Sequence, residues 1–153
     1  MSVAVSKNSQ LGVADIERYL DSAALPLRLA VNSAEGTPLV ASHWFLYREG
    51  ALYCVLHKSS LVARCLARDG RCAFEVGSDQ VPYRGVRGQA KATLSDSGVD
   101  TLLKALFARY RINPDSRLAT WLSGRVADER LVCIRPEWVS GWDFSERMAD
   151  AID

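Results

Sequence analysis

The stretch of this sequence best suited to chemistry is a run of four polar residues, His57-Lys58-Ser59-Ser60. An apolar pattern over residues 61–66 follows it directly and predicts a helix of about two turns that also carries Arg64. A helix N-terminus presents unpaired backbone N–H groups and the positive end of a dipole, so hydroxyls and cations placed there can hold a phosphate. A serine that only caps the helix, with both basic side chains in water, explains the same residues. The run therefore predicts a phosphate site, with a plain helix cap as the alternative.

The motifs of several other enzyme classes are absent from the sequence. It contains no G-x-S-x-G, H-E-x-x-H, G-x-x-x-x-G-K-[ST] or G-x-G-x-x-G pattern, which disfavours hydrolases, zinc proteases, P-loop proteins and Rossmann proteins. The two histidines, His43 and His57, are separated in sequence. Gly85 and Gly88 form only a G-x-x-G pair, which more often marks strand bending or close packing. We therefore assign no catalytic side chain.

The four cysteines, Cys54, Cys65, Cys72 and Cys133, lie in apolar stretches without a C-x-x-C pair or a nearby histidine cluster. We expect buried thiols in a reducing compartment rather than disulfides or a metal site. Residues 1–10 are small and polar and lack the apolar segment of a signal peptide. The sequence therefore predicts a cytoplasmic protein.

The composition is that of one soluble globular domain. The chain has 153 residues, 48% of them hydrophobic, and 19 basic residues against 18 acidic ones. This near-neutral balance disfavours nucleic acid or an acidic membrane surface as the main partner. The longest uncharged apolar stretch, residues 37–47, is well short of the roughly 20 residues that span a bilayer. Any anion site must therefore be local.

Apolar periodicity predicts the elements that position these residues. Runs at residues 27–32, 38–47 and 51–57, separated by short turns, predict three strands in an antiparallel meander. Apolar residues occupy both the odd and the even positions of the middle run, so we expect both faces of this strand to be covered. Further strands are predicted at residues 71–76, 83–94 and 131–134, and helices at residues 99–110 and 115–122. We expect a single domain, 1–153, with an N-terminal helix at about 13–22, a barrel at about 27–95 and 130–144, and inserted helices at about 98–122.

The order and spacing of short segments resemble the pyridoxamine 5′-phosphate oxidase-like superfamily of flavin-binding split barrels. These segments are PLRLAV at 26–31, GTPLV at 36–40 leading into Trp44-Phe45, GALY at 50–53 leading to Ser60, RCAFEV at 71–76, PYRGV at 82–86 with Gly88-Gln89-Ala90, IRP at 134–136 and GWDF at 141–144. The resemblance implies a mainly β fold with flanking helices, a six-stranded antiparallel split barrel of the FMN-binding type. It also implies a homodimer with FMN in grooves between the subunits.

The resemblance also implies which residues bind the cofactor. Arg28, Leu29, Ala30 and Val31 would lie along the flavin edge, and Ser42, His43 and Trp44 would back the ring. His57, Lys58, Ser59 and Ser60 with Arg64 would hold the phosphate, and Arg87 and Trp142 would come from the second subunit. For His43, His57 and Trp142, ordinary packing or hydrogen bonding is the alternative.

One departure from the family pattern concerns the phosphate. Family members commonly have a lysine two residues after the serine that matches Ser60, whereas this chain has Leu61 and Val62 there. Lys58 and Arg64 could substitute, since both could reach an anion at the helix end. The alternatives are a weaker FMN site, or another cofactor such as the deazaflavin F420 or haem.

The function that the resemblance implies is a flavin-dependent oxidoreductase with small-molecule electron donors and acceptors. The flavin would carry out hydride transfer, while the protein binds and orients it. Arg28 is the candidate for a positive charge near the pyrimidine end of the ring. A non-catalytic cofactor carrier or sensor is the second hypothesis, and a dimeric interaction module without ligand is the third.

Overall fold

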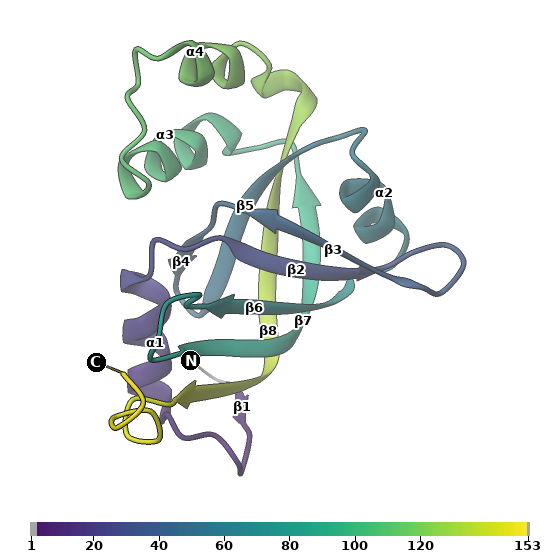
Figure 1. The fold of residues 1–153 in the computed structure, drawn as a ribbon. Coiled ribbons are helices and arrows are strands. Elements are labelled where there is room, and N and C mark those ends of the chain that lie inside the picture. Colours follow the sequence, from purple (N-terminus) through teal and green to yellow (C-terminus); the bar gives the residue numbers. More distant parts are fainter. Residues whose placement is uncertain (1–2, 153) are drawn as a thin grey trace.

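The computed structural model describes residues 3–152. Its sheet has eight strands, in the order β3-β2-β6-β7-β8-β5-β4, with the short β1 paired to β8 (Figure 1). All pairs are antiparallel except β1 with β8. The strands are β1 (Ala4–Val5), β2 (Leu27–Asn32), β3 (Pro38–His43), β4 (Leu46–Arg48), β5 (Ala51–His57), β6 (Arg71–Gly77), β7 (Arg84–Ser95) and β8 (Glu129–Asp143). The helices are α1 (Val13–Ser22), α2 (Leu61–Arg68), α3 (Val99–Arg109) and α4 (Arg117–Ser123), with a 3-10 turn at Val126–Asp128.

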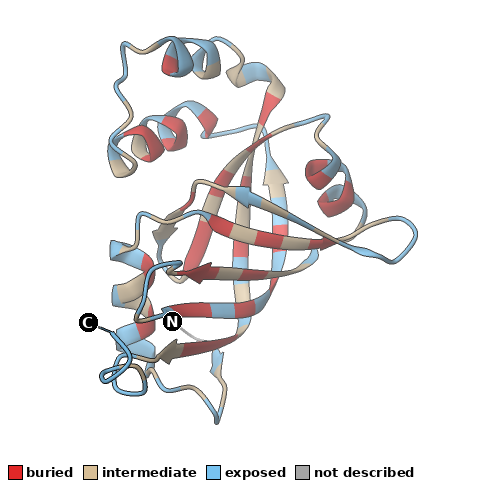
Figure 2. Ribbon diagram, viewed as in Figure 1, coloured by how far each residue is buried: buried red, intermediate tan, exposed pale blue. Residues whose placement is uncertain are grey.

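The sheet curls around one apolar core. Buried and part-exposed residues alternate along β2, so Leu27, Leu29 and Val31 point inward while the residues between them face outward. The same alternation along most of the other long strands keeps the buried positions on the inside of the barrel (Figure 2). The edge strands β3 and β4 are not paired with each other, so the barrel is split between them. The mainly antiparallel barrel with flanking helices confirms the predicted fold class, with eight strands instead of six.

The predicted three-strand meander is wrong, because residues 38–47 form two strands that belong to opposite edges of the sheet. β3 pairs with β2, and β4 pairs with β5. The chain turns at Trp44 and Phe45, where the Phe45 side chain is fully buried. Within a single chain one face of β3 is open, since Val40 is 62% exposed on the outer face. Only a partner could cover that face, so the expectation that both faces are covered stays a prediction.

The helices α3 and α4 stand together over one end of the barrel (Figure 1). Leu103 and Phe107 of α3 pack against Ala119 of α4 in a small second core. Arg109, near the end of α3, donates hydrogen bonds to three carbonyls at the C-terminal end of α1. Tyr110 donates a hydrogen bond to the Leu25 carbonyl and accepts one from the Phe45 N–H. The inserted helices are therefore fixed to the barrel beside the β3–β4 break.

Candidate functional site

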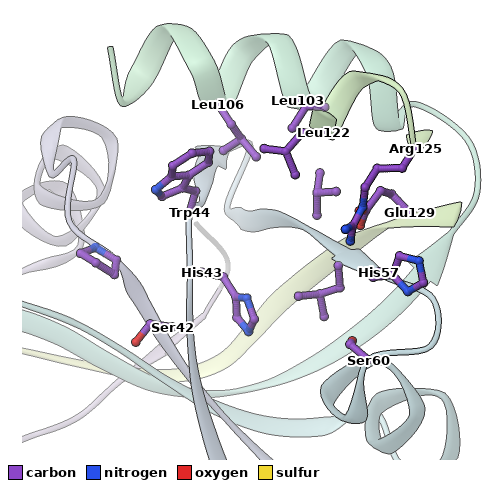
Figure 3. Close-up of a pocket in the computed structure, with 13 residues that line it drawn as sticks. Ser42, His43, Trp44, His57, Ser60, Leu103, Leu106, Leu122, Arg125 and Glu129 are labelled. Atoms are coloured by element: carbon purple, nitrogen blue, oxygen red, sulfur yellow. The ribbon is translucent and has the colours of Figure 1, made fainter. Parts of the chain in front are cut away.

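A cavity of about 470 Å³ lies between the barrel and the inserted helices, and we call it the β3–β5 cavity (Figure 3). Its size falls within the usual range for small-molecule sites, about 300–1,000 Å³. The end of β3, the end of β5, the start of α2 and the start of β8 form its barrel side, while α3 and α4 roof it. The lining residues are Pro26, Ser42, His43, Trp44, Val55, Leu56, His57, Ser60, Leu103, Leu106, Leu122, Arg125 and Glu129.

The cavity has an apolar end and a polar end. Trp44 lies near Leu103, Leu106 and Leu122, whereas the other end carries four polar side chains, His57, Ser60, Arg125 and Glu129 (Figure 3). His43 lies between the two ends, and Ser42 is on the Trp44 side. The Trp44 ring is held in place by Tyr110, which stacks on it with centroids 5.5 Å apart and planes inclined by 21°. Such a wall suits a flat apolar ring that carries hydrogen-bonding groups at one end.

His43 lines the cavity with an unused hydrogen-bonding atom. Its Nε2 is buried and has no hydrogen-bond partner among the described residues. Burial lowers the pKa of His43, because the charged imidazolium is disfavoured away from water. The neutral ring can therefore offer one donor or acceptor to a ligand in the cavity.

His57 and Ser60 also line the cavity, and one polar atom of each is engaged within the turn. The Ser59 hydroxyl oxygen lies 2.7 Å from Nδ1 of His57, and the Ser59 N–H donates to the same nitrogen. The Ser60 hydroxyl accepts a hydrogen bond from the Ala63 N–H at 3.1 Å, which makes Ser60 the N-cap of α2. The structure therefore shows a helix cap at this turn, and the Ser60 hydroxyl hydrogen can still be donated to a ligand.

The polar end contains an ion pair that the sequence interpretation missed. Arg125 Nε lies 2.5 Å from Oε1 of Glu129, whose side chain is only 3% exposed. The Arg125 guanidinium also lies 4.2 Å from the centre of the Trp121 ring. The spacing of four residues was the only available signal, but Arg125 and Glu129 lie in the connection from α4 to β8, not within one helix.

The structure brings five of the predicted cofactor residues together around the β3–β5 cavity. They come from β3 and the turn after it, from β5, and from the cap of α2: Ser42, His43, Trp44, His57 and Ser60.

Two predicted phosphate ligands, Lys58 and Arg64, lie elsewhere. Both line a separate cavity of about 690 Å³, the Arg64 cavity, together with Ala63, Ala67, Leu94, Ser95, Asp96 and Arg130. Lys58 Nζ is 2.6 Å from the Asp128 carboxylate and lowers the pKa of that acid. Val62, at the family's lysine position, is buried in the barrel core.

The remaining predicted residues lie on β2, β7 and β8. Arg28, Ala30 and Arg87 line a third cavity of about 380 Å³ on the outer face of the sheet. Arg87 stacks over Trp142 at 5.6 Å. Arg28 pairs across the strands with Ser42, so this third cavity adjoins the β3–β5 cavity. The side chains of two further predicted residues point into the core, so only their backbone could touch a cofactor: Leu29 and Val31.

The residues at the β3–β5 cavity fit one part of FMN and not the other. The apolar end and the free Nε2 of His43 suit an aromatic ring with polar edges. The two predicted phosphate cations line the Arg64 cavity, and the Ser60 hydroxyl accepts a hydrogen bond within the turn. A ring therefore has a fitting site here, whereas the cations expected to bind a phosphate lie outside it.

Other kinds of site have no support among residues 3–152. No cluster of His, Cys, Asp and Glu in this part of the chain could hold a metal ion. The four cysteines are free thiols, and burial raises the pKa of Cys54 and of Cys72 to about 12. Within the same residues, no helix combines the length and the apolar character that crossing a lipid bilayer requires.

No protein-family model and no curated protein matches the chain. Solved structures do match. A conserved hypothetical protein from Mycobacterium tuberculosis is 18% identical, with 92% of this chain and 90% of that one covered and a TM-score of 0.76. An F420 reductase is 21% identical over 80% of this chain and 94% of that one, with a TM-score of 0.69. A haem storage protein from Vibrio cholerae is 17% identical over 82% and 87%, with a TM-score of 0.61.

These likenesses establish the fold. The chain has the split-barrel fold of the pyridoxamine 5′-phosphate oxidase-like proteins, as the resemblance in sequence predicted.

Proposed function

From this fold, we propose that the chain binds a flavin-type cofactor in the β3–β5 cavity and acts as an oxidoreductase. The observation that carries the proposal is the convergence of Ser42, His43, Trp44, His57 and Ser60 on one cavity. The family resemblance assigns the same five residues to the cofactor. Proteins with the same fold that are named for F420, FAD and haem support a cofactor of this kind.

A flavin is the first candidate, with FMN as the form that the family resemblance implies, and F420 and haem are the alternatives. A bound flavin supplies hydride transfer at its ring, so the protein's task is to bind, orient and exclude water. In this proposal Trp44 packs against the ring and His43 offers Nε2 to its polar edge. Arg28, beside Ser42 at the open side of the cavity, supplies a positive charge near the ring. This mechanism assigns no side chain as a general acid or base.

A homodimer is part of the proposal. Val40 is 62% exposed on the outer face of the sheet, beside Ala30 and Ala73 in the same row. A second copy that covers this apolar row would bring further residues to the open side of the site. Sedimentation equilibrium tests the dimer, and replacement of Val40 by Glu is expected to yield monomers.

The test of the oxidoreductase is turnover of the loaded protein. Protein loaded with FMN is mixed with NAD(P)H without oxygen, and the flavin absorbance is followed before and after a small-molecule acceptor is added. Bleaching followed by recovery at a useful rate supports an oxidoreductase. A retained cofactor that no donor and acceptor pair turns over contradicts it and favours the second candidate, a cofactor carrier or sensor. The changed phosphate motif, with Leu61 and Val62 after Ser60, motivates that second candidate.

A further inference from the structure

Resting on the proposed function, we infer that the β3–β5 cavity takes an uncharged aromatic ring and excludes phosphate, because Glu129 neutralises Arg125. The preferred ligand is therefore a flavin-type ring without a phosphate. Glu129 becomes the residue that determines this specificity, and nothing in the family resemblance assigns it a role.

The charges that line the cavity carry the inference. Among the described residues that line it, Arg125 is the only arginine or lysine, and Glu129 is the only acid. The two are paired at 2.5 Å, so their charges cancel. His43 is held neutral by burial. Apart from His57, the side chains that line this cavity therefore offer a ligand hydrogen-bonding groups but no uncompensated positive charge.

An entering phosphate would disturb a buried pair. To bind Arg125 fully it would have to displace Glu129, whose side chain is 3% exposed and would be left with an uncompensated buried charge. To bind only the outer nitrogens of Arg125 it would sit beside the Glu129 carboxylate and be repelled by it.

The other cations near the site do not change this balance. Lys58 is paired with Asp128, and Arg64 faces the separate Arg64 cavity. The α2 start adds hydrogen-bonding groups but no side-chain charge, because its N-cap Ser60 accepts from the Ala63 N–H and keeps its own hydroxyl hydrogen. Arg28 lies beside Ser42 and lines the third cavity, so its charge is outside the lining of the β3–β5 cavity. The polar end at Arg125 and Glu129 is therefore neutral.

The test compares riboflavin with FMN, which differ only in the phosphate. Binding of each is measured by flavin fluorescence at mildly alkaline pH for the wild type and for three variants. Glu129→Gln frees the charge of Arg125, and Arg125→Gln with Glu129→Gln keeps the cavity neutral. Glu137→Gln, at an exposed position of β8 outside the cavity, is the matched control.

The wild type is expected to bind riboflavin at least about tenfold more tightly than FMN, and Glu129→Gln to shift this ratio toward FMN by about tenfold or more. The double variant and the Glu137→Gln control should keep the wild-type ratio. Tighter binding of FMN by the wild type, with a ratio that Glu129→Gln leaves unchanged, overturns the inference. If Glu129→Gln does not fold, the double variant decides, because a loss of FMN affinity there means that Arg125 binds the phosphate.

A second measurement separates this inference from the proposed function. If the wild type binds neither flavin, the proposed function fails. The cavity is then probed with inorganic phosphate, followed by the NMR signals of the Arg125 and Trp121 side chains. Shifts in Glu129→Gln and none in the wild type support a cavity that excludes phosphate. Shifts in the wild type overturn it.

Discussion

Replacing Tyr110 by Phe removes one hydroxyl that joins three parts of the fold. This hydroxyl donates to the Leu25 carbonyl at 2.8 Å and accepts from the Phe45 N–H at 3.1 Å. Burial raises the pKa of Tyr110, so the hydroxyl keeps its proton and can continue to donate. The phenylalanine ring can still stack on Trp44, so the substitution isolates the two hydrogen bonds.

The expected loss follows from the two groups left without a partner. A buried donor or acceptor without a partner costs about 1–3 kcal/mol. Both hydrogen bonds are only partly buried, so we expect a total of about 2–4 kcal/mol, since water can reach part of each group. For a chain of this size that loss lowers the melting temperature by roughly 5–10 °C.

Chemical denaturation followed by tryptophan fluorescence and circular dichroism measures this loss. Tyr83→Phe is the matched control, because the Tyr83 side chain is exposed and its hydroxyl makes no hydrogen bond to the described residues. Its free energy of unfolding should stay within about 0.5 kcal/mol of the wild type. A loss below about 0.5 kcal/mol for Tyr110→Phe would show that this hydroxyl does not fix α3 to the β3–β4 break.

Three other predictions follow from contacts and charges. Gly88→Ala should destabilise the barrel by about 1–3 kcal/mol in thermal unfolding, because the new Cβ would lie 2.5 Å from a carbonyl oxygen of β8. Gly12→Ala is the control, since the space around Gly12 is open. Because the pKa of His43 is lowered in the folded protein, the unfolded chain takes up a proton at a higher pH, so the free energy of unfolding should fall as the pH drops below about 6.5. His43→Phe should reduce this pH dependence. If the free energy of unfolding of His43→Phe changes with pH as steeply as that of the wild type, the prediction is contradicted. Replacing Lys58 and Arg64 together by Ala should change flavin affinity less than about threefold, because both cations line the Arg64 cavity. A much larger loss of affinity in a binding titration would place the cofactor in the Arg64 cavity instead.

Local patterns in the sequence predicted much of the fold. Ile16 and Leu20 are the buried residues of α1, and their spacing predicted the helix where it is found. The error at residues 38–47 arose because an apolar run looks the same whether it is one covered strand or two strands joined at a buried residue. Only the position of β4 beside β5, on the far edge of the sheet, separates these cases, and that pairing is a long-range contact.

The candidate site was predictable only in part. The family resemblance pointed to Ser42, Trp44 and His57, and these residues meet at one cavity. The resemblance did not indicate where the side chains after β5 point. Arg64 was therefore expected beside Ser60, whereas α2 places Arg64 at the separate Arg64 cavity. Arg125 and Glu129 belong to the inserted segment, where no motif marks them. Their contact depends on how the α4–β8 connection crosses the barrel end, which local periodicity does not encode.

The most direct test of the central claim is whether a bound flavin occupies the β3–β5 cavity. Wild-type protein is incubated with excess flavin, freed of unbound ligand and examined by visible absorption beside two variants of α4. Leu122→Trp fills the cavity, and Leu118→Trp changes an exposed residue of the same helix outside it. The account predicts about one retained flavin per chain in the wild type and in Leu118→Trp, and none in Leu122→Trp. A colourless wild type, or equal retention by both variants, would contradict it.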